Sequence, residues 1–279
     1  GKKGPCHTKF KGKGEHEVMA CVLEQCPILY RSELRPGVVD MVLGAPRIAP
    51  LCSPGQFVHI KCSPDLLLRR PISLCDVEQD TIRLVIESVG KGSQWLCERQ
   101  AGELLDLLGP LGDHGFPVPD AAQGDSRPLL LVGGGVGSAP LLYCAKSSPV
   151  PVDAALGFGS AGAVILERDF ARCCRSVTVS TDDGSYGFAG FVTGAAQQLL
   201  EKEDYRAVYA CGNMTMLRAV AELTQRLDVP CYLSLDERMG CGLGACLVCA
   251  VKVRGEDGEH YSHVCKQGPV YRREEVVFE

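Results

Sequence analysis

The chain has 279 residues, of which 46% are hydrophobic and 23% charged, an ordinary composition for a soluble globular protein. Two or three domains are expected at this length. The net charge of -5 gives no support to a nucleic-acid partner, which would call for a basic face. The sixteen cysteines occur in a long, core-rich chain, unlike those of short disulfide scaffolds, so we expect reduced thiols and a cytoplasmic location.

Residues 1–16 are rich in Gly and Lys and are predicted to be a loose lead-in without the apolar stretch of a signal peptide. The longest uncharged run, residues 128–145, is long enough to span a membrane. Its Gly, Ser and Pro residues favour a strand, a turn and a helix instead. We therefore expect no membrane partner.

Residues 17–112 show short strands separated by Pro and Gly. The clearest cover residues 38–43, 56–61 and 81–87, and in the last Ile82, Leu84 and Ile86 alternate with polar residues. Such alternation is typical of half-buried strands, and several at this spacing predict an antiparallel β-barrel.

Two polar motifs lie within this predicted barrel. Residues 69–73 read Arg-Arg-Pro-Ile-Ser, in which arginine suits bidentate contact with phosphate and Ser73 offers a hydroxyl to a ring edge. Residues 90–93 read Gly-Lys-Gly-Ser, which resembles a turn whose N–H groups hold a phosphate oxygen. Each motif alone is common on protein surfaces, so their significance depends on the segments that come later in the chain.

The periodicity changes in residues 128–230. Residues 129–132 form a continuous apolar strand, and Gly133–Pro140 then leads into a helical segment. A strand, glycine turn and helix place a helix N-terminus against a pyrophosphate, although the motif here is only G-x-G-x-x-P. Further strands at 152–158, 176–181 and 207–211 alternate with helices and predict a doubly wound parallel sheet. Cys211 and Gly212 end a strand at the carboxyl edge, where ligands bind in such sheets, but alone Cys211 indicates only a small buried residue.

Residues 231–279 begin with a predicted strand at 230–235 and continue into a glycine-rich cysteine loop. Its spacing, C-x4-C-x2-C…C, is that of a plant-type [2Fe–2S] cluster and comprises Cys241, Cys246, Cys249 and Cys265. Glycines at 240, 242 and 244 let the backbone approach the inorganic core. Structural zinc usually joins two short C-x2–4-C units, and only Cys246–Cys249 forms one. The spacing thus favours iron–sulfur over zinc, and His260 and His263 are expected to be surface residues rather than Rieske ligands.

Several segments together resemble the electron-transfer subunit of NAD-dependent (type B) dihydroorotate dehydrogenase, within the ferredoxin reductase superfamily. The likeness extends from about residue 17 to nearly the end of the chain. It rests on Pro-Gly-Gln-Phe at 54–57, the motifs at 69–73 and 90–93, Gly-Pro-Leu-Gly at 109–112, the glycines at 133–137, Thr-Asp-Asp-Gly-Ser-Tyr-Gly at 181–187 and Ser-Leu-Asp-Glu-Arg-Met-Gly-Cys at 234–241. The last segment is the most specific.

The resemblance implies three groups of binding residues. FAD would be held by Arg70, Pro71, Ile72, Ser73, Val85, Ile86, Glu87, Gly92 and Ser93. NAD would face Gly133, Gly134, Gly135, Gly137, Cys211 and Gly212. The [2Fe–2S] cluster would be held by Cys241, Cys246, Cys249 and Cys265. The sequence departs from the family pattern at Glu87, Asn213 and Thr215, where the family often has Arg, Pro and Pro.

The function implied is electron transfer in pyrimidine biosynthesis, without chemistry on dihydroorotate by this chain. A partner subunit bearing FMN would oxidise dihydroorotate, in a complex expected to be a heterotetramer, and electrons would reach NAD+ through the cluster and FAD. A flavin is needed there because NAD exchanges electrons in pairs and a cluster one at a time. Two alternatives are a flavin and iron–sulfur NAD(P)H reductase for another acceptor, and a zinc-bearing interaction module without redox activity.

Overall fold

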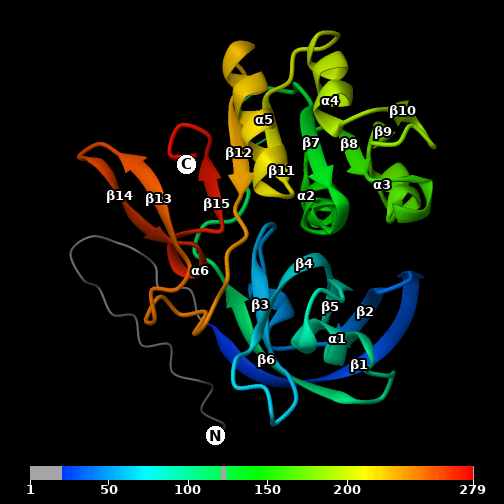
Figure 1. Ribbon diagram of the computed structural model, residues 1–279, viewed down its shortest axis with the longest axis vertical. Coiled ribbons are helices and arrows are strands. Elements are labelled where there is room, and N and C mark those ends of the chain that lie inside the picture. The colour runs from blue at the N-terminus through cyan, green and yellow to red at the C-terminus, as the bar shows by residue number, and fades with distance from the viewer. Residues whose placement is uncertain (1–20, 121–123, 279) are drawn as a thin grey trace, which may run out of the picture.

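The computed structural model describes residues 21–120 and 124–278, so the predicted lead-in at 1–16 lies outside the described residues. Figure 1 shows a β-barrel below an α/β lobe, with the C-terminal segment alongside both. Among the described helices, none is long and apolar enough to cross a membrane.

The lower lobe is a closed antiparallel barrel, as predicted, with the strand order β1-β2-β5-β4-β3-β6. Its core contains the alternating Ile82, Leu84 and Ile86, which are at most 1% exposed. One short helix, α1 (Lys91–Cys97), follows the fifth strand. The strands are β1 (Val22–Arg35), β2 (Val38–Gly44), β3 (Phe57–Lys61), β4 (Arg70–Glu78), β5 (Thr81–Glu87) and β6 (Leu104–Leu111).

The upper lobe is built on a seven-stranded sheet with the order β10-β9-β8-β7-β11-β12-β15. All pairings are parallel except that of β15 with β12. The strands are β7 (Leu129–Gly134), β8 (Val152–Phe158), β9 (Ser176–Thr181), β10 (Phe188–Ala189), β11 (Ala207–Cys211), β12 (Cys231–Ser234) and β15 (Val270–Arg272). The predicted parallel sheet is therefore confirmed.

Helices cover both faces of this sheet because side chains of a strand alternate between its faces. Leu129 and Leu131 of β7 belong to the core that contains residues of α2 and α3, whereas Leu130 and Val132 belong to the core that contains residues of α4 and α5. The sheet is thus doubly wound. The helices are α2 (Ala139–Ser147), α3 (Glu167–Cys173), α4 (Val192–Leu200) and α5 (Met214–Arg226).

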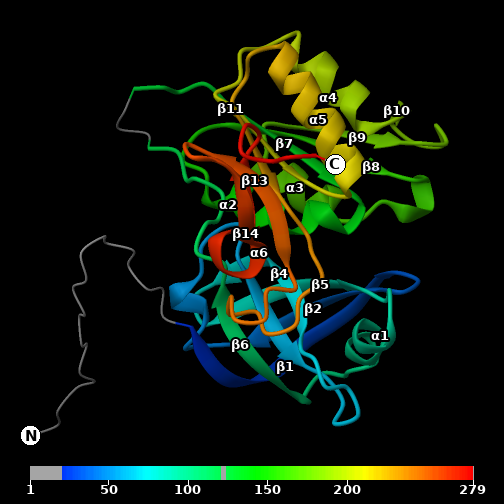
Figure 2. The same ribbon diagram turned by 60° about the vertical axis from the view of Figure 1, so that its left-hand side comes forward.

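The C-terminal segment is joined to the α/β lobe at two strands. The chain leaves β12, descends beside the barrel, and returns through the hairpin of β13 (Ala250–Gly255) and β14 (Gly258–His263) (Figure 2). Helix α6 (Val264–Gln267) then leads to β15, which pairs with β12. Because β12 and β15 both lie in the large sheet, the cysteine loop is anchored at each end. The division into domains at residues 112, 128 and 231 stays a prediction.

Candidate functional site

The cysteine loop between β12 and β13 aims backbone amides at its own sulfurs. Sγ of Cys241 accepts hydrogen bonds from the amides of Leu243, Ala245 and Cys246, at 3.3, 3.3 and 3.4 Å. Sγ of Cys265, from α6, accepts one from Gly244 at 3.2 Å. Gly244 has a φ of +79°, a conformation that other residues adopt only with strain. The amides therefore surround the thiols as they would surround bound thiolates.

The four predicted ligands lie in two pairs. Cys241 neighbours Cys246, whose Sγ accepts a hydrogen bond from the Cys241 amide at 3.3 Å. Cys249 neighbours Cys265, with the Cys265 amide 3.4 Å from Sγ of Cys249. Within the described residues, no three His, Cys, Asp or Glu side chains are arranged to hold a single metal ion.

The environments of the pairs differ. Burial disfavours the Cys241 thiolate, but the amides of Leu243, Cys246 and Ala245 outweigh this effect and lower its pKa to about 6. Burial and the neighbouring Cys249 raise the pKa of Cys265 to about 12. Cys249 and Cys265 are each 2% exposed, whereas Cys246 is exposed. One pair thus lies inside the protein and the other toward the surface.

The two polar motifs of the barrel meet in space. Arg70 at the start of β4 packs so closely over Gly92 of α1 that a Cβ on Gly92 would collide with its Nε atom. Nη1 of Arg70 donates to the carbonyl oxygen of Leu68 at 2.6 Å. Arg69 is occupied elsewhere, because its Nη2 pairs with Asp106 of β6 at 2.7 Å. Only the second arginine of the motif is therefore placed to meet a ligand.

The predicted turn at 90–93 is the first turn of α1. Oγ of Ser93 accepts hydrogen bonds from the amides of Val89 and Gly90, at 2.9 and 3.1 Å, and caps this turn. Ser93 is 8% exposed, whereas Ser73 on β4 is exposed. Ser73 thus offers its hydroxyl to a ligand, and Ser93 mainly shapes the turn.

The three predicted flavin residues at the end of β5 differ in access. Ile86 is 1% exposed in the barrel core, and Val85 is 7% exposed and belongs to the core shared with the α/β lobe. Their side chains are committed to packing, so backbone atoms are what they offer to a ligand. Glu87 pairs with Arg35 at 2.6 Å and lines a large cavity at the carboxyl edge of the parallel sheet.

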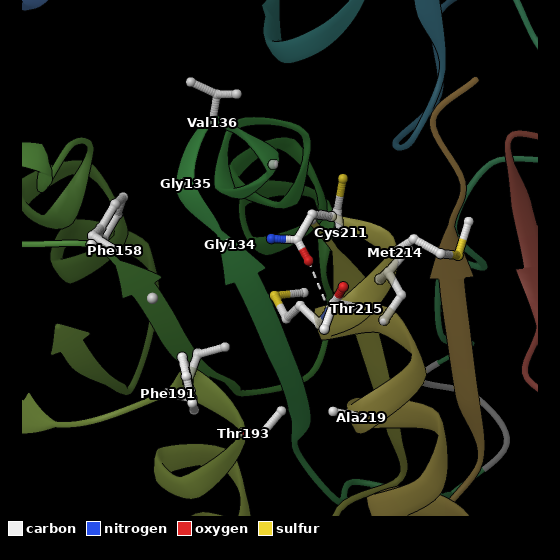
Figure 3. Close-up of a pocket in the computed structure, with 18 of the residues that line it drawn as sticks. Gly134, Gly135, Val136, Phe158, Phe191, Thr193, Cys211, Met214, Thr215 and Ala219 are labelled. Carbon is white, nitrogen blue, oxygen red and sulfur yellow. Dashed lines mark hydrogen bonds between the residues drawn. The ribbon is translucent and has the colours of Figure 1, made fainter. Parts of the chain in front are cut away.

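This cavity, of about 980 Å³, opens at the carboxyl ends of β7, β8, β9 and β11. Figure 3 shows Phe158 and Phe191 on one side of it and Cys211, Met214 and Thr215 on the other. The predicted Gly134, Gly135, Gly137, Cys211 and Gly212 all line it, together with Glu87, Val136, Gly157, Gly159, Asp182, Val192, Thr193, Asn213, Met216, Leu217, Ala219 and Asp236. This is the edge at which parallel sheets of this kind bind ligands.

The glycines permit a close approach of two loops at this cavity. A Cβ on Gly137 would lie 2.7 Å from the carbonyl oxygen of Cys211 and 2.8 Å from Cα of Gly212. A Cβ on Gly133, which does not line the cavity, would lie 2.8 Å from Cα of Ser138. Burial raises the pKa of Cys211 to about 12, so its thiol is a neutral part of the wall.

The departure from the family pattern at Asn213 has a structural explanation. Oδ1 of Asn213 accepts a hydrogen bond from the amide of Met216 at 2.9 Å and caps the N-terminus of α5. Thr215 lies in the first turn of that helix and faces the cavity (Figure 3).

Among the site residues that the sequence reasoning missed are three ionisable side chains. Asp182 and Asp236 line the cavity, and burial raises the pKa of Asp236. His59 of β3 lies under the cysteine loop. Both aspartates fall inside motifs quoted for the resemblance, Asp182 one residue after β9 and Asp236 two residues after β12, and that position was the available signal. No signal in the sequence pointed to His59, because nothing in the sequence relates β3 to the cysteine loop.

Comparisons with known proteins agree with this arrangement. Residues 236–277 match the family model described as the iron-sulfur cluster binding domain of dihydroorotate dehydrogenase B. The dihydroorotate dehydrogenase B (NAD(+)) electron transfer subunit of Geobacillus thermodenitrificans is 44% identical over 245 residues, or 85% of this chain and 92% of that protein. The subunit of the same name from Bacillus mycoides is 39% identical, over 90% of this chain and 96% of its own length.

A solved NADH-dependent reduced ferredoxin-NADP oxidoreductase, described in terms of flavin-based electron bifurcation, is similar with a TM-score of 0.81 and 27% identity, over 91% of this chain and 90% of that one. A ferredoxin reductase of carbazole 1,9a-dioxygenase shares the fold at a TM-score of 0.61 and 21% identity, over 75% of this chain and 66% of that one. At this level of identity and coverage, the chain belongs to the family of dihydroorotate dehydrogenase B electron transfer subunits.

Proposed function

We propose that this chain transfers electrons between a dihydroorotate-oxidising FMN subunit and NAD+, using a [2Fe–2S] cluster in the cysteine loop and FAD on the barrel. The observation that carries this proposal is the position of the loop. It surrounds four thiols with amides and packs against the strand next to the Arg70–Ser73 motif. When bound, the flavin exchanges electron pairs with NAD and single electrons with the cluster.

The cysteine loop fits a two-iron cluster. Two pairs of thiols suit two irons with two ligands each, and the four cysteines would be its ligands. The amides on Cys241 and Cys265 stabilise thiolates, and amide hydrogen bonds to sulfur also tune the potential of a bound cluster. A zinc-bearing module without redox function does not predict the large cavity at the carboxyl edge of the sheet.

The flavin would lie against β4 and α1. Arg70 over Gly92 supplies a cation for its phosphates, and Ser73 supplies a hydroxyl for its ring edge. The flavin would also contact Pro71 and Ile72, the partly buried residues between Arg70 and Ser73. Val85, Ile86, Gly92 and Ser93 would contribute backbone atoms, and Glu87 would contact it from the cavity side.

The cavity would hold NAD. Gly134, Gly135 and Gly137 leave room for the pyrophosphate, Gly133 keeps the turn tight, and Cys211 with Gly212 forms the opposite wall. Among the lining residues Glu87, Asp182 and Asp236 are acidic, and none of the described lining residues is Lys or Arg. This negative charge favours a dinucleotide whose ribose 2′-hydroxyl is free, as in NAD, over one that carries a 2′-phosphate, as in NADP.

The partner subunit would dock at the exposed end of the loop. Cys246 is exposed there, and Leu243, Leu247 and Val248 around it are 49–58% exposed, which is unusual for apolar side chains. A partner covering them would bring its own cofactor near the outer cysteine pair. We further propose a heterotetramer with the FMN subunit and a cytoplasmic location.

Replacing Cys246 with Ser in the complex tests the proposed function. The variant should retain FAD and oxidise NADH with an artificial acceptor, but lose dihydroorotate-dependent reduction of NAD+. Cys21→Ser, at an exposed cysteine far from the loop in sequence, is the control. Unchanged dihydroorotate-linked turnover in the Cys246 variant would contradict the electron path. A colourless wild-type protein containing zinc would support the interaction module instead.

A further inference from the structure

His59 on β3 is a buried histidine without a hydrogen bond. Its side chain is 0% exposed, yet in the described structure neither Nδ1 nor Nε2 makes a hydrogen bond of regular geometry, although the backbone of Cys241 approaches the ring. A buried donor without a partner is destabilising, so native proteins rarely keep one without a reason. Barrel packing does not supply that reason, because an apolar residue would fill the space without this cost.

The ring lies on the outer face of the barrel. Val58 and Ile60, its neighbours along β3, belong to the barrel core, so alternation directs Phe57 and His59 outward. Opposite them on β4, in register, are Ser73 and Pro71 of the proposed flavin site. Residues directly opposite in an antiparallel pair share a face, so His59 and the proposed flavin contacts lie on the same surface.

The cysteine loop covers this ring. A Cβ on Gly242 would lie 2.6 Å from Nδ1 of His59 and 3.0 Å from Cε1, so the backbone of the loop rests directly on the imidazole. Gly242 has a φ of +72° and follows the predicted ligand Cys241. His59 thus touches the loop from β3, the strand that pairs with the flavin motif on β4.

The imidazole brings a hydrogen-bond donor to this position. An imidazole keeps at least one N–H donor in either protonation state. Because the loop backbone at Gly242 rests on the ring, His59 brings a directed donor under the loop.

We propose that His59 is a positioning residue for the cysteine loop, and that its unpaired N–H serves as a hydrogen-bond donor to the iron–sulfur group bound there. This inference rests on the proposed function. Hydrogen bonds to cluster sulfurs raise the reduction potential, and outer-shell partners hold the ligands in place. His59, on the flavin face of the barrel, would thereby help to set both the reduction potential and the position of the cluster.

The test compares His59→Leu, which fills space without a donor, with His59→Gln, which keeps an N–H donor. Iron, sulfide and FAD are measured per chain in the purified complex, and the cluster potential is determined by a redox titration followed by electron paramagnetic resonance. At a fixed applied potential, His59→Leu should lower the ratio of reduced to oxidised cluster by up to about tenfold. For a one-electron couple, a tenfold change corresponds to a reduction potential lower by about 59 mV. His59→Gln should restore most of that ratio.

Each outcome decides the question. An unchanged potential in a fully loaded His59→Leu variant overturns the proposal. If His59→Leu fails to load the cluster, a loaded His59→Gln variant with a potential near that of the wild type supports it, and loss of the cluster in both overturns it in favour of packing alone. A wild-type complex without a [2Fe–2S] signal would instead contradict the proposed function, so the two failures are distinguishable.

Discussion

Arg83 joins the barrel to the α/β lobe through two carboxylates. From β5, its Nε and Nη2 each lie 2.8 Å from an oxygen of Asp40 on β2. Its Nη1 lies 2.9 Å from Oδ1 of Asp169 on α3. The Asp40 side chain is only 7% exposed, whereas that of Asp169 is 28% exposed. The two arms of this bridge should therefore differ in strength.

Replacing Arg83 with Leu leaves the Asp40 carboxylate buried without its partner. Removing one member of a buried ion pair costs about 3–5 kcal/mol, and we expect about 3 kcal/mol because the arginine is partly exposed. Asp169→Asn removes only the outer arm and should cost about 1 kcal/mol or less. The double variant Arg83→Leu/Asp40→Leu should recover most of the loss, because no charge then remains buried.

The free energy of unfolding is measured by denaturant titration of the flavin-loaded protein, with fluorescence and circular dichroism followed together. The reasoning fails if Arg83→Leu unfolds at the wild-type midpoint. It also fails if the double variant is no more stable than Arg83→Leu. Coincident transitions for the two probes are required before the midpoints are compared.

Three further predictions concern the cofactor sites and pH. Arg70→Ala should lower the FAD retained after gel filtration at least severalfold while the iron content stays constant, and full flavin occupancy would remove Arg70 from the site. Gly137→Ala, whose Cβ would meet the carbonyl oxygen of Cys211, should raise KM for NADH about tenfold or more with unchanged flavin absorbance, and an unchanged KM would refute the close approach. Burial opposes ionisation of Asp153, but hydrogen bonds from a guanidinium, a phenol and a hydroxyl outweigh it and hold its pKa below the usual range. Its stabilisation is therefore present above the ordinary carboxyl pKa and lost as pH falls through the lowered one, so Asp153→Asn should be less stable at pH 7 and flatten the acid limb of the stability profile.

The local sequence pattern was sufficient to predict most strands and the cysteine loop. The strand predicted at 81–87 has those bounds in the structure, and so do those at 152–158, 176–181 and 207–211. Two of these strands, β8 and β11, are wholly buried, and β5 buries alternate residues, so each has a simple hydrophobic pattern. No individual range was predicted for β1, β4, β6, β10, the β13–β14 hairpin or β15. Most of β14 is exposed, so it carries little hydrophobic alternation, and β15 has only three residues.

The sequence by itself determined the barrel, the parallel sheet and the thiol spacing, because those depend on residues close together in the chain. Only the tertiary structure decided which groups meet: Arg70 with Gly92, Gly137 with Cys211, and His59 with Gly242. Each of these contacts joins segments that are distant along the chain, and each depends on how the lobes and the returning C-terminal segment pack. The physical reason is that periodicity reports which face of an element is buried, but not which other element buries it.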